Sequence, residues 1–119
     1  MHEGPQRISR LSTQELLPGM ILSNEPGYYR PGSFGIRIEN LIYVRGAEEI
    51  EGGDMAMLGF ETLTFCPIDR SLVIPELLTH DELHWFNDYH RRTREALMPL
   101  THDHDVRAWL ENATLPLEY

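Results

Sequence analysis

The chain has 119 residues, of which 41% are hydrophobic, a single cysteine and a formal net charge of −9. This length supports one globular core without disulfides, and a lone cysteine excludes an intramolecular one. The acidic balance, with ten dispersed arginines and no lysine, argues against nucleic acid as a partner. The sequence shows no long apolar run and no signal-peptide core, so the expectation is a cytoplasmic, non-membrane protein.

The first part of the chain predicts an antiparallel hairpin. Residues 1–19 read as irregular because glycines and prolines interrupt them. A short apolar run at 20–23 is typical of a strand. Residues 30–33 place Pro and then Gly at the centre of a type II turn. The β-branched and aromatic residues of 35–45 then predict a longer returning strand.

A third strand is expected after a polar loop. The loop covers residues 48–54, and the partly alternating stretch at 58–68 follows it. Cys66 lies in this apolar stretch and is interpreted as a small buried hydrophobe. The candidates for the core are Phe60, Leu63 and Phe65.

The last third predicts two helices. Thr79 and Glu82 have the spacing of a capping box, which begins a helix over residues 80–98. Pro99 interrupts this helix, and a second one is expected from about Asp103 to Asn112. The aromatic residues of both helices are interpreted as core, including a second-helix face of Val106, Trp109, Leu110 and Ala113. The fold class is therefore α+β, with antiparallel strands first and two C-terminal helices after them.

Two glutamates flank the predicted turn. If pairing is centred near Pro31, residues whose numbers sum to 63 or 64 face each other, so Glu25 and Glu39 are opposite or diagonal. Like charges in such a pair repel, and a divalent cation would relieve the repulsion because hard oxygen ligands suit Mn, Mg, Co or Zn. Arg37 lies on the same face and would offset part of the charge. Spacing alone favours a plain solvent-exposed face instead.

The sequence motifs around these glutamates resemble those of a known family. HEGP (2–5), PGMILSNEPGYY (18–29) and FGIRIEN (34–40) are similar to motifs of aminopeptidase P, the Xaa-Pro aminopeptidase of the pita-bread-fold metallopeptidases. LGFETLTFCPID and LHWFNDYH resemble the C-terminal extension of its long, three-domain cytosolic form. The resemblance implies part of a catalytic domain at 1–57 and an extension at 58–119.

The resemblance also implies a site. Members of the family use two divalent ions, usually manganese, to hydrolyse peptides with proline at the second position. Glu25 would bind one ion and also act in catalysis, and Glu39 would bridge both. His2 would contact the substrate and help stabilise the tetrahedral intermediate, while Arg37 and Tyr29 would support the site. A homodimer is a further implied partner.

The chain departs from the family pattern in its ligand set. The family's metal-binding histidine and two aspartates precede HEGP, so three of the five expected ligands are absent from this sequence. The expectation is a piece of the peptidase that is inactive alone and binds metal weakly or not at all. The alternatives are a non-catalytic interaction or dimerisation module, a fragment that completes a site in trans, or a stable relic.

The remaining histidines do not replace the absent ligands. The run His102-Asp103-His104-Asp105 is interpreted as a solvated helix start whose spacing is not that of a helical ligand pair. Three further histidines are expected at the surface or in caps: His80, His84 and His90.

Overall fold

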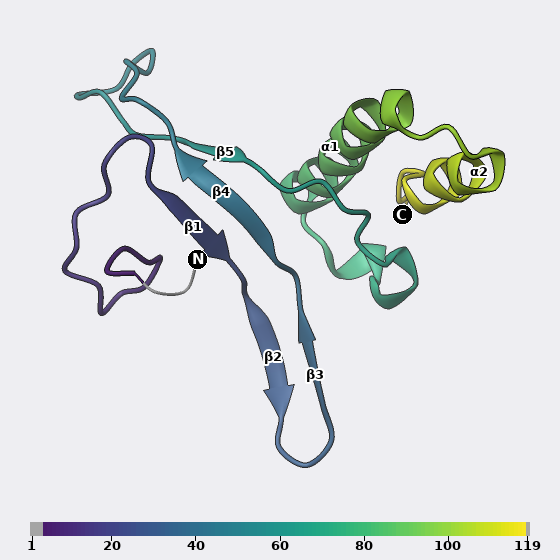
Figure 1. The fold of residues 1–119 in the computed structure, drawn as a ribbon. Coiled ribbons are helices and arrows are strands. Elements are labelled where there is room, and N and C mark those ends of the chain that lie inside the picture. The colour runs from purple at the N-terminus through teal and green to yellow at the C-terminus, as the bar shows by residue number, and fades with distance from the viewer. Residues whose placement is uncertain (1–3, 119) are drawn as a thin grey trace. The chain divides into compact units, whose positions relative to one another are not determined.

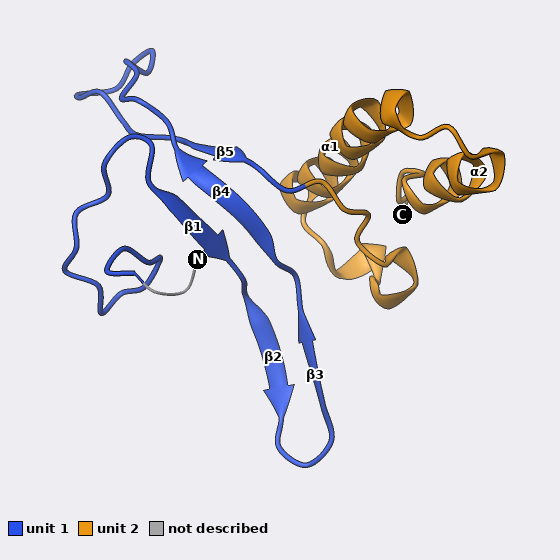
Figure 2. Ribbon diagram, in the orientation of Figure 1, with its two compact units in different colours: residues 1–64 blue, residues 65–119 orange. Residues whose placement is uncertain are grey.

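A computed structural model describes residues 4–118 and confirms the α+β class, with antiparallel strands followed by two α-helices (Figure 1). The chain divides into two compact units, Met1–Thr64 and Phe65–Tyr119 (Figure 2). Within the described residues, the longest helix lacks the apolar character needed to cross a membrane.

Unit 1 contains two antiparallel sheets. Strands β1 (Ile21–Asn24), β4 (Asn40–Val44) and β5 (Phe60–Thr62) form a three-stranded sheet in the order β1-β4-β5. Strands β2 (Gly27–Arg30) and β3 (Phe34–Arg37) form a two-stranded sheet. In Figure 1, β2 continues the path of β1, and β3 leads back into β4.

One register runs through both sheets. Paired residues have numbers that sum to 64 from Arg30 and Phe34 near the turn to Ile21 and Tyr43 at the far end. The register therefore passes without a slip through the junction between the sheets, where Ile38 N–H donates to the Pro26 carbonyl at 3.2 Å. This confirms one of the two registers expected from the position of the turn.

The returning strand is shorter than predicted. The stretch 35–45 was expected as one strand, but residues 38 and 39 separate β3 from β4. Pro26 lies opposite this break and has no N–H to donate, so the ladder cannot be complete there. The turn itself agrees with the prediction, since Gly32 has φ 69° and Ser33 N–H donates to the Arg30 carbonyl.

The core of unit 1 is small and lies on one face of the three-stranded sheet. Leu22, Ile42 and Val44 are buried, and Leu16 and Met20 pack against them. Two of the three expected core residues on the third strand are wrong, because Phe60 and Leu63 are 48% and 42% exposed, whereas Phe65 is partly buried. The third strand also covers only residues 60–62, and beyond it Leu63 N–H donates to the Leu41 carbonyl while Thr64 Oγ1 accepts from Leu41 N–H at 3.0 Å, so a side chain takes the place of the backbone ladder there.

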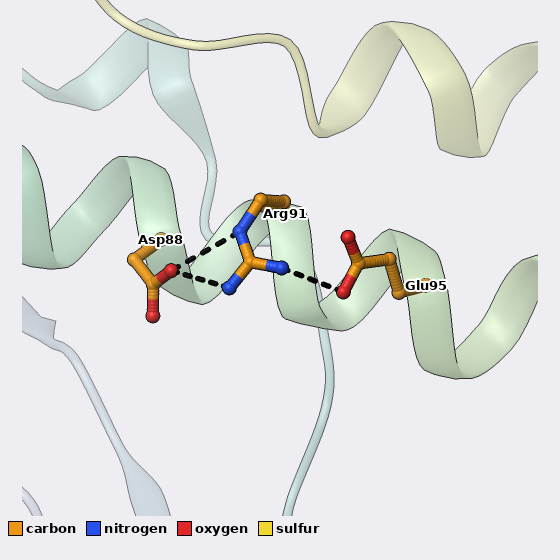
Figure 3. Close-up of polar contacts among 3 residues, drawn as sticks. All are labelled: Asp88, Arg91 and Glu95. Carbon is orange, nitrogen blue, oxygen red and sulfur yellow. Dashed lines mark hydrogen bonds and ion pairs between the residues drawn. The ribbon is translucent and has the colours of Figure 1, made fainter.

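Unit 2 is built on helix α1 (His80–Leu97), which begins where the sequence predicts. Thr79 Oγ1 accepts from the Glu82 backbone N–H, and Glu82 Oε2 accepts from the Thr79 backbone N–H at 2.8 Å. On the exposed face, Arg91 lies between Asp88 and Glu95, with nitrogen–oxygen distances of 2.6 and 2.7 Å (Figure 3). These ion pairs follow the helical spacing of three and four residues.

The remaining elements of unit 2 are short. The 3₁₀ turns η1 (Arg70–Leu72) and η2 (Pro75–Leu77) precede α1, and η3 (Met98–Leu100) ends it at Pro99. Helix α2 (His104–Ala113) is capped by Asp103, whose Oδ1 accepts from the N–H groups of Asp105 and Val106. The predicted helix end and second helix are thus confirmed to within a residue or two.

Side chains of α1 make hydrogen bonds with the backbone of two extended segments, around residues 66–68 and at Leu117. Tyr89 Oη accepts from Cys66 N–H at 3.1 Å and donates to the Cys66 carbonyl at 3.0 Å. His90 Nε2 accepts from Ile68 N–H at 3.0 Å. Asn87 makes a two-bond pair with the backbone of Leu117, at 2.8 and 3.0 Å. These bonds satisfy backbone groups that no sheet pairs.

Several predicted burial states in unit 2 are wrong. His90 was expected at the surface but is fully buried, because it follows Tyr89 on the face that binds residues 66–68. Cys66 was expected to be buried but is exposed, since only its backbone is held by Tyr89. Trp109 and Val106 are 59% and 49% exposed, and Leu110 alone on α2 is buried among the described residues.

Candidate metal centre

The candidate site lies at the junction between the two sheets of unit 1. Glu25 directly follows β1 and Glu39 directly precedes β4, and their numbers fit the register of the residues on both sides. The two glutamates are therefore opposite each other across the hairpin. Their side chains are about equally accessible, at 30% and 32%.

Arg37 joins the two carboxylates. Its Nη1 lies 3.3 Å from Glu25 Oε2, and its Nη2 lies 3.0 Å from Glu39 Oε2. The charge of Glu39, followed by a hydrogen bond with Tyr29, raises the pKa of Arg37 above its ordinary value. The offsetting role expected of Arg37 from the sequence thus corresponds to two direct contacts.

Glu25 has a second donor in the preceding strand, β1. Ser23 Oγ donates to Glu25 Oε1 at 2.7 Å, so Ser23 and Arg37 bind different oxygens of one carboxylate. Ser23 was not among the residues singled out from the sequence. Its position two residues before Glu25 puts it on the same face of an extended chain, and this spacing is the signal that could have identified it.

Tyr29 lies across two glycines of the hairpin. A Cβ at Gly27 would meet Tyr29 Oη at 2.7 Å, and a Cβ at Gly35 would meet Tyr29 Cδ1 at 2.8 Å. Neither glycine is required by a positive φ, so their role here is to leave space for the ring. The ring consequently rests against the backbone of β2 and β3 and reaches towards Arg37.

A surface pocket adjoins Glu25. Gln6 closes one side of it by donating from Nε2 to the Ile21 carbonyl at 3.3 Å. Its further lining comes from Arg7 and Ile8 before β1, from Leu22 and Ser23 of β1, and from Pro26 after it. Glu25 thus borders a space large enough for solvent or a small group.

The donor set fits part of a metal site. Both carboxylates point towards one guanidinium, and carboxylate oxygens are the ligands that hard divalent cations prefer. Within residues 4–118, no group of three or more His, Cys, Asp or Glu side chains comes together. The described part of the chain therefore offers a pair of ligands rather than a full coordination sphere.

The other candidate residues lie elsewhere or outside the described range. His2 lies outside residues 4–118. His80 and His84 are exposed on α1, and His102 and His104 are exposed around the start of α2. Apart from His90, which is buried within unit 2, these positions agree with the interpretation of the histidines as surface residues.

Two family models match the chain. A model described as the C-terminal region of peptidase M24 matches residues 56–117, which is more than half of the chain. A model of metallopeptidase family M24 matches residues 1–46. The second range contains the candidate carboxylates and the first contains both α-helices.

Curated relatives match almost the whole chain. Aminopeptidase P2 of Arabidopsis thaliana is 48% identical over 98% of this chain, and a probable Xaa-Pro aminopeptidase P of Coprinopsis cinerea is 43% identical over 98%. The aligned regions make up 17% and 20% of those proteins. The chain thus spans about a fifth or less of the length of these relatives.

A solved structure also matches almost the whole chain and only a small part of a longer peptidase. The X-prolyl aminopeptidase of Caenorhabditis elegans, described as a cytosolic enzyme with a di-nuclear active site, superposes with a TM-score of 0.76. The match covers 92% of this chain and 18% of that protein, with 33% sequence identity. The strand-and-helix arrangement of the present chain therefore occurs within a much longer peptidase.

Proposed function

The chain belongs to metallopeptidase family M24, and we propose that it supplies the glutamate ligands of a dinuclear Xaa-Pro aminopeptidase. The observation that carries this proposal is the opposition of Glu25 and Glu39 with one guanidinium between them. The names of the relatives and the di-nuclear site of the C. elegans enzyme support the same reaction class.

The site residues have distinct proposed roles. Glu25 and Glu39 would hold two divalent ions, most simply Mn²⁺, with Glu39 shared between them. Ions bound there would supply Lewis-acid activation of the scissile carbonyl and of a water molecule. Glu25 would accept the proton of that water as general base. Arg37, supported by Tyr29, would offset the repulsion between the two carboxylates. His2 would bind the substrate.

The proposed substrates are peptides with proline at the second position, cleaved in the cytoplasm, with a homodimer as the assembly. Two carboxylates hold a divalent ion weakly, because stable sites use more ligands with fixed geometry. The chain by itself would therefore bind metal weakly and lack peptidase activity. It would need ligands from a further polypeptide segment.

A chimera tests the proposal directly. This chain replaces the matching region of Arabidopsis aminopeptidase P2, and hydrolysis of an Xaa-Pro peptide is compared with that of an Xaa-Ala peptide. We expect Xaa-Pro hydrolysis that depends on added Mn²⁺. Glu25→Gln and Glu39→Gln should each reduce it by more than about 100-fold, beyond the effect of losing an outer-shell partner.

The control for these variants is Glu51→Gln, an exposed glutamate in the loop after β4. It should leave the rate unchanged. A folded chimera that binds no Mn²⁺, or whose activity survives Glu25→Gln, would contradict the proposal.

A non-catalytic interaction module is the second candidate, and the hairpin is what favours it. All eight residues of β2 and β3 are exposed, and Tyr28, Phe34 and Ile36 form an apolar face on it. Under this alternative, Glu25→Gln and Glu39→Gln would leave association unchanged, whereas Phe34→Ser would weaken it. Sedimentation of the chain and its variants tests association, and Mn²⁺-dependent hydrolysis by the chimera distinguishes the two candidates.

A further inference from the structure

We propose that Ser23 is a positioning residue that holds the Glu25 carboxylate in its metal-binding orientation. This inference rests on the proposed function. It concerns a hydroxyl that neither the sequence motifs nor the family comparisons assign to the site. Ser23 would not touch the metal or the substrate, and would act only through Glu25.

The first support is the contact itself. Ser23 Oγ donates to Glu25 Oε1 at 2.7 Å, which is a short bond of the kind formed by a hydroxyl with a charged acceptor. Arg37 contacts the other oxygen, Oε2, at 3.3 Å. Donors on both oxygens fix the plane of the carboxylate, and the short contact is the one made by Ser23.

The second support is the weakness of the backbone at this point. Glu25 follows the last residue of β1 and precedes Pro26, which cannot donate to a ladder. A side chain on such a junction is held less firmly by its backbone than one inside a strand. Ser23 lies within β1, paired with Leu41 of β4, so its hydroxyl is anchored by the sheet.

The third support is a correspondence between the two arms of the hairpin. Each glutamate receives a hydrogen-bonding or ionic contact from the residue two positions before it: Glu25 from Ser23, and Glu39 from Arg37 at 3.0 Å. Period-two geometry places each such donor on the same face as its glutamate. Arg37 then crosses to Glu25, which links the two arms.

This arrangement has a consequence for metal binding. Outer-shell donors orient a ligand before the ion arrives, and their loss typically costs about 10–100-fold in metal affinity. Without the hydroxyl, Glu25 Oε1 would lose its short contact and the carboxylate would rotate about its side-chain torsions. We therefore expect loss of the Ser23 hydroxyl to weaken Mn²⁺ binding by about tenfold.

The experiment uses the 119-residue chain and an isosteric pair of variants. Ser23→Thr keeps the hydroxyl, whereas Ser23→Val has the same shape without it, and both β-branched residues suit a strand. Ser33→Ala, which removes an exposed hydroxyl in the turn, is the matched control. Mn²⁺ affinity is measured by the loss of the paramagnetic resonance signal of the free aqueous ion.

A second readout needs no metal. The carboxyl ¹³C resonance of Glu25 in the metal-free chain responds to hydrogen bonding at Oε1. We expect this resonance to move in Ser23→Val and to stay near its parent position in Ser23→Thr and Ser33→Ala. Circular dichroism and the amide spectrum confirm that each variant is folded.

The outcomes separate this inference from the proposed function. Affinity that is retained in Ser23→Thr and Ser33→Ala but falls about tenfold in Ser23→Val supports it. Equal affinities and an unmoved Glu25 resonance in Ser23→Val overturn it. If the parent chain by itself binds too little Mn²⁺ to measure, the metal-free Glu25 resonance decides, and an unmoved resonance in Ser23→Val overturns it. If Glu25→Gln and Glu39→Gln abolish binding while Ser23→Val changes nothing, only the role of Ser23 fails. If neither glutamine variant affects binding, the proposed metal site itself fails.

Discussion

The β2–β3 hairpin and the helical unit keep their shape by different means. Every residue of β2 and β3 is exposed, so backbone pairing and the contacts of Arg37 and Tyr29 hold this part of the chain. Unit 2 instead buries Phe86, Tyr89 and His90 and uses them to bind neighbouring segments. The candidate site therefore lies in the less densely packed region, where polar contacts rather than a core set side-chain positions.

The strongest test of this contrast removes the core of unit 2. Phe86 is 3% exposed, and Phe86→Ala should lower the free energy of unfolding of unit 2 by about 3–5 kcal/mol through lost burial and a cavity. Hydrogen exchange of the α1 amides measures the change. Leu77→Ala, at a residue that is 78% exposed, serves as the control and should have little effect. Unchanged exchange in Phe86→Ala would contradict the assignment of Phe86 to the core.

A smaller effect is expected from closing the space under Tyr29. In Gly27→Ala the new Cβ would lie 2.7 Å from Tyr29 Oη and 3.0 Å from the Ile36 carbonyl, so the ring must move. Overpacking of this kind costs about 1–3 kcal/mol, although the exposed ring can relax and so reduce the cost. The amide and aromatic resonances of Tyr29 and the amide resonance of Arg37 should shift.

Gly46→Ala is the matched control, since nothing lies within 4 Å of a Cβ at that position. Equal spectra for Gly27→Ala and Gly46→Ala would show that the glycine next to Tyr29 has no special role in placing the ring.

The mildest perturbation is acidification, which should act on unit 2 through His90. Burial, followed by the charge of Arg70, lowers the pKa of His90 below its ordinary value of 6.5. The unfolded chain then binds more protons than the folded chain, so stability rises with pH. The contribution of His90 is fully present above pH 6.5 and declines as pH falls below it.

Denaturant unfolding of unit 2 at a series of pH values checks this sign. His90→Gln can still accept from Ile68 N–H but cannot titrate, so its stability should fall less between neutral and mildly acidic pH. A parallel decline in both proteins would mean that other groups cause the pH dependence. Leu77→Ala, at an exposed residue without a titratable side chain, is the control variant and should keep the parent profile.

Local signals in the sequence predicted much of the fold. The Pro31-Gly32 turn set the register of the hairpin, because a turn of fixed length determines which residues pair. Thr79 and Glu82 likewise fixed the start of α1 through bonds between residues three positions apart. The position of the turn left Glu25 and Glu39 either opposite or diagonal to each other, and the register of the structure selects the opposite arrangement.

Burial was predicted less well, because it depends on what lies across from a residue rather than beside it. Phe60, Leu63 and Trp109 have apolar side chains but are exposed, whereas His90 is polar and buried. No local pattern distinguishes these cases. The position of a neighbouring segment decides them, as for His90, whose burial follows from the path of residues 66–68.

The sequence by itself determined the order of the elements and limited the hairpin to two registers, with the two glutamates opposite or diagonal, since these features depend on contacts between near neighbours or across one turn. Only the tertiary structure decided that Arg37 spans both carboxylates, that Ser23 binds Glu25 Oε1, and that Tyr29 rests on two glycines. These contacts depend on side-chain torsions and on the space left by neighbours, which a linear pattern does not specify.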